Sequence, residues 1–178
     1  MKLPDSANNF KIRQFLKKQT MKNFRTIITF CAFGIAFLTG CSNDDDKDTT
    51  KPEIDMTISE AFPTSCTNIQ KGSTIYFKAL FKDNQALGAY SIDIHNNFNH
   101  HNHDTETGSC NFDPEKTPIN PWTEILTFSI PANTQEFVAE HSINIPEDID
   151  SGDYHFMIQL TDAQGWATMK GISIKIID

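Results

Sequence analysis

Beyond residue 25 the sequence contains no arginine, and lysine is scarce there relative to acidic residues. Seven of the 15 Lys and Arg residues, but only one of the 23 Asp and Glu residues, lie within residues 1–40. The rest of the chain therefore carries eight basic and 22 acidic residues, a net charge of −14. Proteins that bind nucleic acids neutralise phosphates with Lys and Arg. This balance argues against a nucleic-acid partner and favours the attraction of cations.

The sequence also lacks an apolar run long enough for a membrane-spanning helix. The run TIITFCAFGIAFLTG at residues 26–40 is too short, and acidic residues follow it closely. A short basic head at residues 22–25 precedes it, which is the layout of a secretory signal. We therefore interpret residues 1–40 as a signal peptide. Because Met21 already opens a complete signal, residues 1–20 are interpreted as a mis-assigned start.

Cys41 follows small residues at the end of this signal, an arrangement that resembles the lipobox of bacterial lipoproteins. The resemblance implies that Cys41 becomes the lipid-modified first residue of the mature chain, anchored in the outer membrane at the cell surface or the periplasmic face. The alternative is an ordinary signal peptide with a chance cysteine. Residues 41–50 are polar and acidic and predict a flexible tether. This acidic run resembles the surface-export signal of Bacteroidota lipoproteins, the alternative being a plain solubilising linker.

Helical periodicity never persists over residues 51–178, whereas alternation of apolar and polar residues recurs between turn signals. The segment is long enough for one domain with a substantial core. This pattern predicts an all-β domain, an immunoglobulin-like seven-strand β-sandwich. We expect its strands at residues 53–59, 73–84, 89–95, 124–130, 137–145, 154–160 and 172–176.

The segment DSGDY at residues 150–154 opens the sixth expected strand. It matches the tyrosine corner of immunoglobulin-like sandwiches, in which the phenol of the tyrosine, here Tyr154, bonds the backbone a few residues upstream. The disulfide and the tryptophan typical of antibody domains are missing, since Phe156 stands where the second cysteine would be. The similarity to immunoglobulins is therefore one of architecture only.

The sequence has only four cysteines. Cys31 leaves with the signal and Cys41 takes the lipid, so that Cys66 and Cys110 are left. In an exported protein two such cysteines usually pair. They lie in the connections after the first and the third expected strands, which meet at one end of such a sandwich. We predict a Cys66–Cys110 disulfide, with two unpaired thiols as the alternative.

The stretch SIDIHNNFNHHNHDTETGSC at residues 91–110 holds four of the six histidines. In the expected fold His95 ends the third strand beside His155 on the sixth, and both alternate outward onto an exposed face of the sheet. The loop after His95 leaves from the same corner. Imidazoles gathered by a rigid scaffold suit a transition metal, Zn or Cu. The predicted ligands are His95, His100, His101, His103 and His155.

Asp93 shares the outward face with His95 and is expected to act as a ligand or to orient an imidazole from behind. His141 lies toward the other end of the sandwich and is expected to be structural. A solvated, asparagine-rich loop is the alternative to a metal site. No nucleophile elbow, P-loop or H-E-x-x-H motif is present, so enzymatic activity is not expected.

The lipobox, the segment IDIHNNFNHHNH and the segment SGDYHFMIQLTDAQGW together resemble an uncharacterised family of Bacteroidota lipoproteins with an Ig-like domain and a histidine-rich segment. The resemblance supports the fold and the location and implies no activity. Two functions therefore compete. One is a metal-binding lipoprotein; the other is an adhesion or glycan-binding surface module, whose aromatic platform would be built from Phe98, Phe112 and Trp122.

Overall fold

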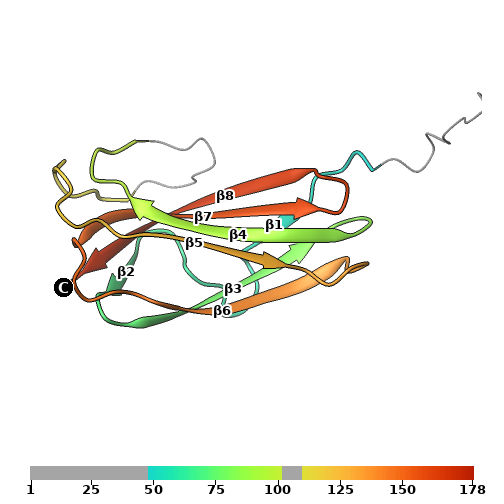
Figure 1. Ribbon diagram of the computed structural model, residues 1–178, viewed down its shortest axis with the longest axis horizontal. Helices are drawn as coiled ribbons and strands as arrows, with labels where there is room; N and C mark the ends of the chain where they lie inside the picture. Colours follow the sequence, from blue (N-terminus) through green and yellow to red (C-terminus); the bar gives the residue numbers. More distant parts are fainter. Residues whose placement is uncertain (1–47, 102–109) are drawn as a thin grey trace, which may run out of the picture. The chain divides into compact units, whose positions relative to one another are not determined.

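The computed structural model describes residues 48–101 and 110–178, so that Cys41 and His103 lie outside the described residues. Within these ranges the chain forms eight β-strands and no helix (Figure 1). No helix in this part of the chain is long and apolar enough to cross a membrane. The strands are β1 (Glu53–Asp55), β2 (Thr67–Gln70), β3 (Thr74–Lys82), β4 (Leu87–Asn96), β5 (Thr123–Ser129), β6 (Glu136–Asn144), β7 (Gly152–Asp162) and β8 (Ala167–Ile177).

The strands form two sheets that pack face to face, as Figure 1 shows. One sheet has the order β1-β3-β6 and the other the order β2-β8-β7-β4-β5. All pairings are antiparallel except that of β2 with β8, which is parallel. The expected all-β, Ig-like sandwich is confirmed.

Two details of the sheets differ from the sequence-based expectation. Residues 67–70 form an additional short strand, which the alternation does not reveal because only Ile69 in it is both apolar and buried. The first expected strand is shorter than predicted, since the Asp55 carboxylate accepts a hydrogen bond from the Thr57 backbone N–H (2.8 Å) and begins a turn. The fourth expected strand forms as β5 and pairs with β4 at the edge of the larger sheet.

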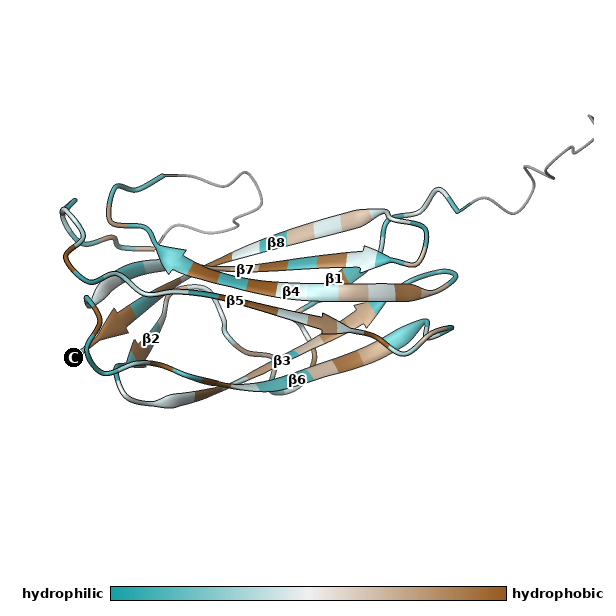
Figure 2. Cartoon of the chain, viewed as in Figure 1, coloured by the Kyte–Doolittle hydropathy of each residue, from teal (hydrophilic) through white to brown (hydrophobic). Residues whose placement is uncertain are grey.

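The core lies between the sheets and is built from the period-two alternation of the strands. Apolar and polar residues alternate along β4 and β7 in Figure 2. Aromatic rings connect the two layers: Phe77 of β3 lies 5.7 Å from Phe156 of β7, and Phe81 lies 5.0 Å from Tyr90 of β4, between ring centroids. Since Phe156 points into this core, its neighbour His155 must point to the other face of the sheet.

Tyr154 closes one end of the sandwich. Its buried hydroxyl donates a hydrogen bond to the Asp150 carbonyl (2.7 Å) and accepts one from the Trp122 backbone N–H (3.3 Å). The Phe98 ring packs edge-on against Tyr154, with 5.3 Å between centroids. The hydrogen bond to Asp150 is the one expected of a tyrosine corner. Together with the bond from Trp122 it connects the β6–β7 turn to the segment that precedes β5.

Cys66 and Cys110 form a disulfide, as predicted, with 5.4 Å between their Cα atoms. The Cys66 backbone N–H donates to the Ser173 carbonyl of β8 (2.8 Å). The disulfide therefore fixes the chain at residue 110 to the end of the larger sheet where β4 ends and β7 begins. The segment after β4 starts and returns at this same end.

Candidate metal centre

Two histidines from different strands stand side by side on the outer face of the larger sheet. His95 of β4 and His155 of β7 are direct partners in the antiparallel register. Their ring centroids lie 5.3 Å apart. Directly opposed residues on adjacent strands have Cβ atoms about 5 Å apart, so the backbone alone brings these two imidazoles together. The pairing matches the juxtaposition that the sequence predicts.

A third histidine is brought to this pair by the segment that follows β4. The His101 ring stacks on His95 (5.5 Å between centroids, 14° between planes) and lies edge-on to His155 (4.7 Å). One ring nitrogen of each of the three histidines lies within 4.8 Å of those of the other two. We call His95, His101 and His155 the histidine group.

Two buried residues position His101. The Asn97 backbone N–H donates to the Asp153 carbonyl of β7 (2.7 Å), and Phe98 inserts its ring against Tyr154. At His100 the backbone φ is positive (52°), in the left-handed region that bends a chain sharply. The segment thus turns back over the sheet and carries His101 above β4 and β7.

The face that carries the histidines is less open than the sequence predicts. His155 has no exposed surface, and the His101 carbonyl lies over it at 3.1 Å from its Nε2. His95 and His101 are partly exposed. Alternation reveals which face of a sheet a side chain takes, but it does not reveal whether a loop packs onto that face. The prediction of an exposed site is therefore corrected to a half-buried one, open on the side of His95 and His101.

One ring nitrogen of each of the three histidines is hydrogen-bonded to an oxygen acceptor. His95 Nδ1 lies 3.0 Å from the Asp93 carboxylate, His101 Nδ1 lies 2.6 Å from Asn99 Oδ1, and His155 Nε2 lies 3.1 Å from the His101 carbonyl. Carboxylate and carbonyl oxygens only accept hydrogen bonds, so these nitrogens carry the proton. The lone pair of each neutral ring is then on His95 Nε2, His101 Nε2 and His155 Nδ1.

This pattern of hydrogen bonds is typical of metal ligands, because histidines that bind metals donate their other N–H to a carboxylate or a carbonyl. Two nitrogens on one zinc ion lie at most about 4.2 Å apart, since each bond is about 2.1 Å long. Ring nitrogens up to 4.8 Å apart must therefore move closer together before all three can bind one ion. Three imidazoles without a thiolate fit Zn²⁺ or Cu²⁺.

The structure does not bring His100 into the histidine group. Its Nε2 donates to the Asp113 carbonyl (2.9 Å), its Nδ1 lies 3.8 Å from the Glu115 carboxylate, and its ring stacks on Phe112 at 5.0 Å. His100 instead contacts the returning segment through Phe112, Asp113 and Glu115. The prediction for His103 falls outside the described residues.

Sequence reasoning identified Asp93 as a residue that orients a histidine but missed Asn99. Both stand two residues before the histidine that they contact, in D-x-H and N-x-H spacing. Asp93 and His95 lie in β4, where residues at this spacing share a face, whereas Asn99 and His101 are brought together by the turn around His100. The spacing of Asn99 therefore gave no reliable signal in the sequence, because the contact depends on this turn.

The aromatic platform suggested for glycan binding is not formed. Phe98 and Trp122 are buried in the core, with 3% and 6% of their surface exposed. Of the three residues only Phe112 is substantially exposed, and its ring stacks on His100. Sugars bind to the open faces of aromatic rings, so these residues do not provide such a surface. This basis for the glycan-binding alternative is wrong.

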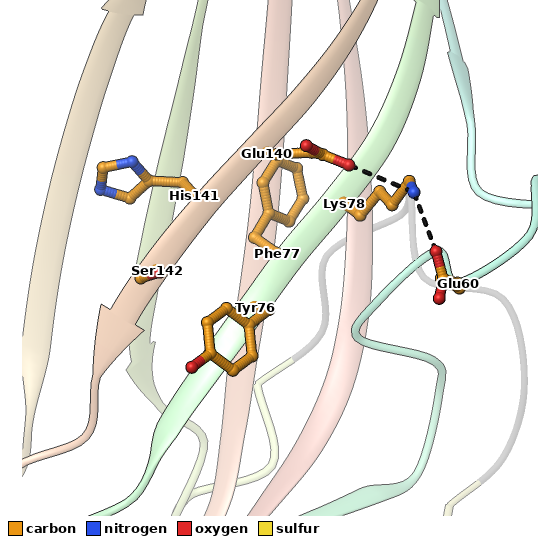
Figure 3. A pocket seen from close by; sticks show the side chains of 7 residues that line it. All are labelled: Glu60, Tyr76, Phe77, Lys78, Glu140, His141 and Ser142. Carbon is orange, nitrogen blue, oxygen red and sulfur yellow. Dashed lines mark hydrogen bonds and ion pairs between the residues drawn. The ribbon is translucent and has the colours of Figure 1, made fainter.

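A hollow of about 720 Å³ lies on the outer face of β3 and β6, in the other sheet (Figure 3). Lys78 stands in it between the carboxylates of Glu60 and Glu140, each 3.1 Å from its Nζ. The hydrogen bond with Glu60, together with that to Glu140, raises the pKa of Lys78 above its usual value. The amine stays protonated and is a poor nucleophile. His141 lines this hollow and is separate from the histidine group, as expected.

The fold and the site define the class of protein: an Ig-like β-sandwich with a three-histidine group at one end of its larger sheet. Residues 39–177 match the family described as Domain of unknown function (DUF4625), and the chain belongs to that family. The match covers both disulfide cysteines and the whole histidine group. No curated protein matches the chain at a significant level. A Bacteroidota origin stays a prediction.

Proposed function

We propose that this protein is a membrane-anchored lipoprotein whose Ig-like domain binds Zn²⁺ or Cu²⁺ through His95, His101 and His155. The observation that carries the proposal is the geometry of the histidine group. Three ring nitrogens lie within 4.8 Å of one another, and each ring is oriented by its own oxygen acceptor. Residues 1–40 supply the signal peptide and Cys41 the anchor in the outer membrane.

The scaffold supports tight binding because little has to be ordered when the ion arrives. His95 and His155 are fixed by adjacent strands, and His101 is fixed by the buried Asn97 and Phe98 next to it. Sites on rigid elements with locked side chains avoid the entropic cost of gathering ligands. The Asp93 carboxylate, hydrogen-bonded to His95, also makes that imidazole a better electron donor.

The number of ligands favours exchange over permanent structural binding. Structural zinc sites use four protein ligands, whereas sites with three protein ligands keep an open position. The described part of the histidine group has three imidazoles, and it is accessible from the side of His95 and His101. Capture, buffering or handover of the metal outside the cytoplasm fits this arrangement. The net negative charge of the chain beyond residue 40 adds a general attraction for cations.

The test is a titration of the full chain, prepared without a polyhistidine tag, with zinc or copper in a calorimeter. His95→Ala and His101→Ala should each weaken binding at least tenfold. His100→Ala is the matched control, since it removes an adjacent imidazole of the same loop that binds Asp113 instead. Its affinity should equal that of the unmodified protein. Because the ligands must be neutral, affinity should fall as the pH drops below about 6.5.

Two results would contradict the proposal. If His100→Ala weakens binding as much as His101→Ala does, the metal is held by the histidine-rich loop in some other geometry. If no histidine variant changes the affinity, the segment is a solvated connection, and the adhesion hypothesis becomes the stronger one. His155→Ala is informative only with a check of folding by circular dichroism, because this side chain is fully buried.

A further inference from the structure

A second group of metal-ligating side chains lies at the other end of the sandwich. Asp48 precedes β1, Asp83 follows β3, and Asp162 ends β7. One carboxylate oxygen of each lies within 4.8 Å of those of the other two. β7 also carries His155 near its start, seven residues before Asp162, which places this aspartate group about 23 Å from the histidine group. Figure 1 shows that β7 runs from one end of the domain to the other.

Each of the three carboxylates is held by one of its two oxygens. The partners are backbone N–H groups two to four residues after each aspartate, and for Asp48 also the side-chain amide of Asn84 in the β3–β4 turn. Asp48 Oδ1 accepts from Thr50 (2.9 Å) and the Asn84 side chain (3.0 Å), Asp83 Oδ2 from Gln85 (2.8 Å) and Ala86 (2.7 Å), and Asp162 Oδ1 from Gln164 (2.9 Å), Gly165 (2.6 Å) and Trp166 (2.8 Å).

The second oxygen of each carboxylate is buried and has no hydrogen-bond partner: Asp48 Oδ2, Asp83 Oδ1 and Asp162 Oδ2. Asp48 and Asp162 are only 2% and 5% exposed. Within residues 48–101 and 110–178 no lysine or histidine forms a salt bridge with any of the three. Buried carboxylates are costly unless a positive charge or hydrogen-bond donors compensate them.

We propose that Asp48, Asp83 and Asp162 bind a calcium ion. Calcium is a hard cation that takes six to eight oxygen ligands, with carboxylates prominent among them. Three carboxylates held in place by turns, each with a second oxygen that lacks a donor, supply such ligands and the negative charge. Carbonyls and water complete the coordination. Magnesium fits less well because it demands regular octahedral geometry and gives up its water reluctantly.

The hydrogen bond from the Thr50 backbone N–H, with that from Asn84, lowers the pKa of Asp48 below its usual value. This carboxylate is therefore charged at neutral pH. The ion would tie Asp48, which precedes the first strand, to the β3–β4 turn and to the end of β7. The proposal is independent of the histidine group and of metal binding there.

Trp166 provides a direct reporter for this site. Its indole N–H donates to the Asp48 carbonyl (2.9 Å), and its backbone N–H donates to Asp162 Oδ1 (2.8 Å). Terbium, which replaces calcium in oxygen-rich sites, emits strongly when an excited tryptophan is close to it. Terbium added to the full chain should therefore give sensitised emission, and calcium should displace it.

The stability test compares the melting temperature of the full chain in calcium chloride and in a chelator. At about 1–5 mM calcium, which saturates most extracellular calcium modules, the melting temperature should rise by about 5 °C. Magnesium at the same concentration should give a clearly smaller shift. An equal shift with magnesium would overturn the assignment to calcium.

The decisive variants are Asp83→Asn and Asp162→Asn, which keep an oxygen for the backbone N–H groups and remove one negative charge. In the chelator they should melt at or above the temperature of the unmodified protein, and they should lose the calcium shift and the terbium emission. Asp55→Asn is the matched control, since Asp55 accepts a similar turn hydrogen bond but lies outside the aspartate group. It should keep the calcium response. Absence of calcium-dependent stabilisation in the unmodified protein, or its persistence in both aspartate variants, would overturn the proposal.

Discussion

Replacing both Cys66 and Cys110 with alanine opens a closed stretch of chain that contains β3, β4 and the histidine-rich segment. The two cysteines are 44 residues apart in the sequence. In the chain-entropy model a loop of this length restricts the unfolded chain by about 13 cal/mol/K, which corresponds to about 4 kcal/mol at room temperature. In this model the disulfide stabilises the protein by restricting the conformations of the unfolded chain. The cysteines are not part of the hydrophobic core, so their packing in the folded domain adds little.

The assay is equilibrium unfolding in urea, with the unmodified protein and the double alanine variant measured under identical conditions. The variant should be less stable by about 4 kcal/mol and melt roughly 15 °C lower. The unmodified protein treated with a reducing agent is the control and should approach the variant. A difference of less than about 1 kcal/mol would refute the loop-closure reasoning, and alkylation of both thiols without a reductant would show that the disulfide does not form.

Three further predictions concern the corner, the pH dependence and the anchor. Tyr154→Phe should cost about 2 kcal/mol, because the Asp150 carbonyl and the Trp122 N–H both lose a partner; an unchanged unfolding midpoint would argue against the corner. The Ile119 backbone N–H holds the pKa of Asp150 below its usual 3.8, so this stabilisation is present above pH 3.8 and is lost as the pH falls through the lowered value. Asp150→Asn should therefore flatten the decline of the unfolding midpoint in acid. Cys41→Ser should move the protein from the membrane fraction to the soluble fraction; a variant that stays with the membrane would refute lipidation at Cys41.

The fold and two of the three members of the histidine group could be predicted because both depend on period-two alternation. Ile94 and Phe156 had to face the core, so that His95 and His155 had to share the outer face. The tyrosine corner placed the start of β7 beside the end of β4. These inferences use only strand geometry, which the sequence encodes locally.

The choice of His101 over His100 could not be predicted, because it depends on a positive φ at His100 and on the burial of Phe98 beneath the turn. The aspartate group was missed for a related reason. Each of its members begins an ordinary tight turn, for which aspartate is common. Only the folded chain shows that these turns bring one carboxylate oxygen of each aspartate within 4.8 Å of those of the other two.

β7 carries a member of the histidine group near its start and a member of the aspartate group at its end. The aspartate group, which includes Asp48, lies at the end of β7, and the histidine group lies near the start of the same strand. Along β7 the two groups are about 23 Å apart, so that they form separate sites on one strand. A second protein could then approach the histidine group to deliver or remove a metal without contacting the aspartate group.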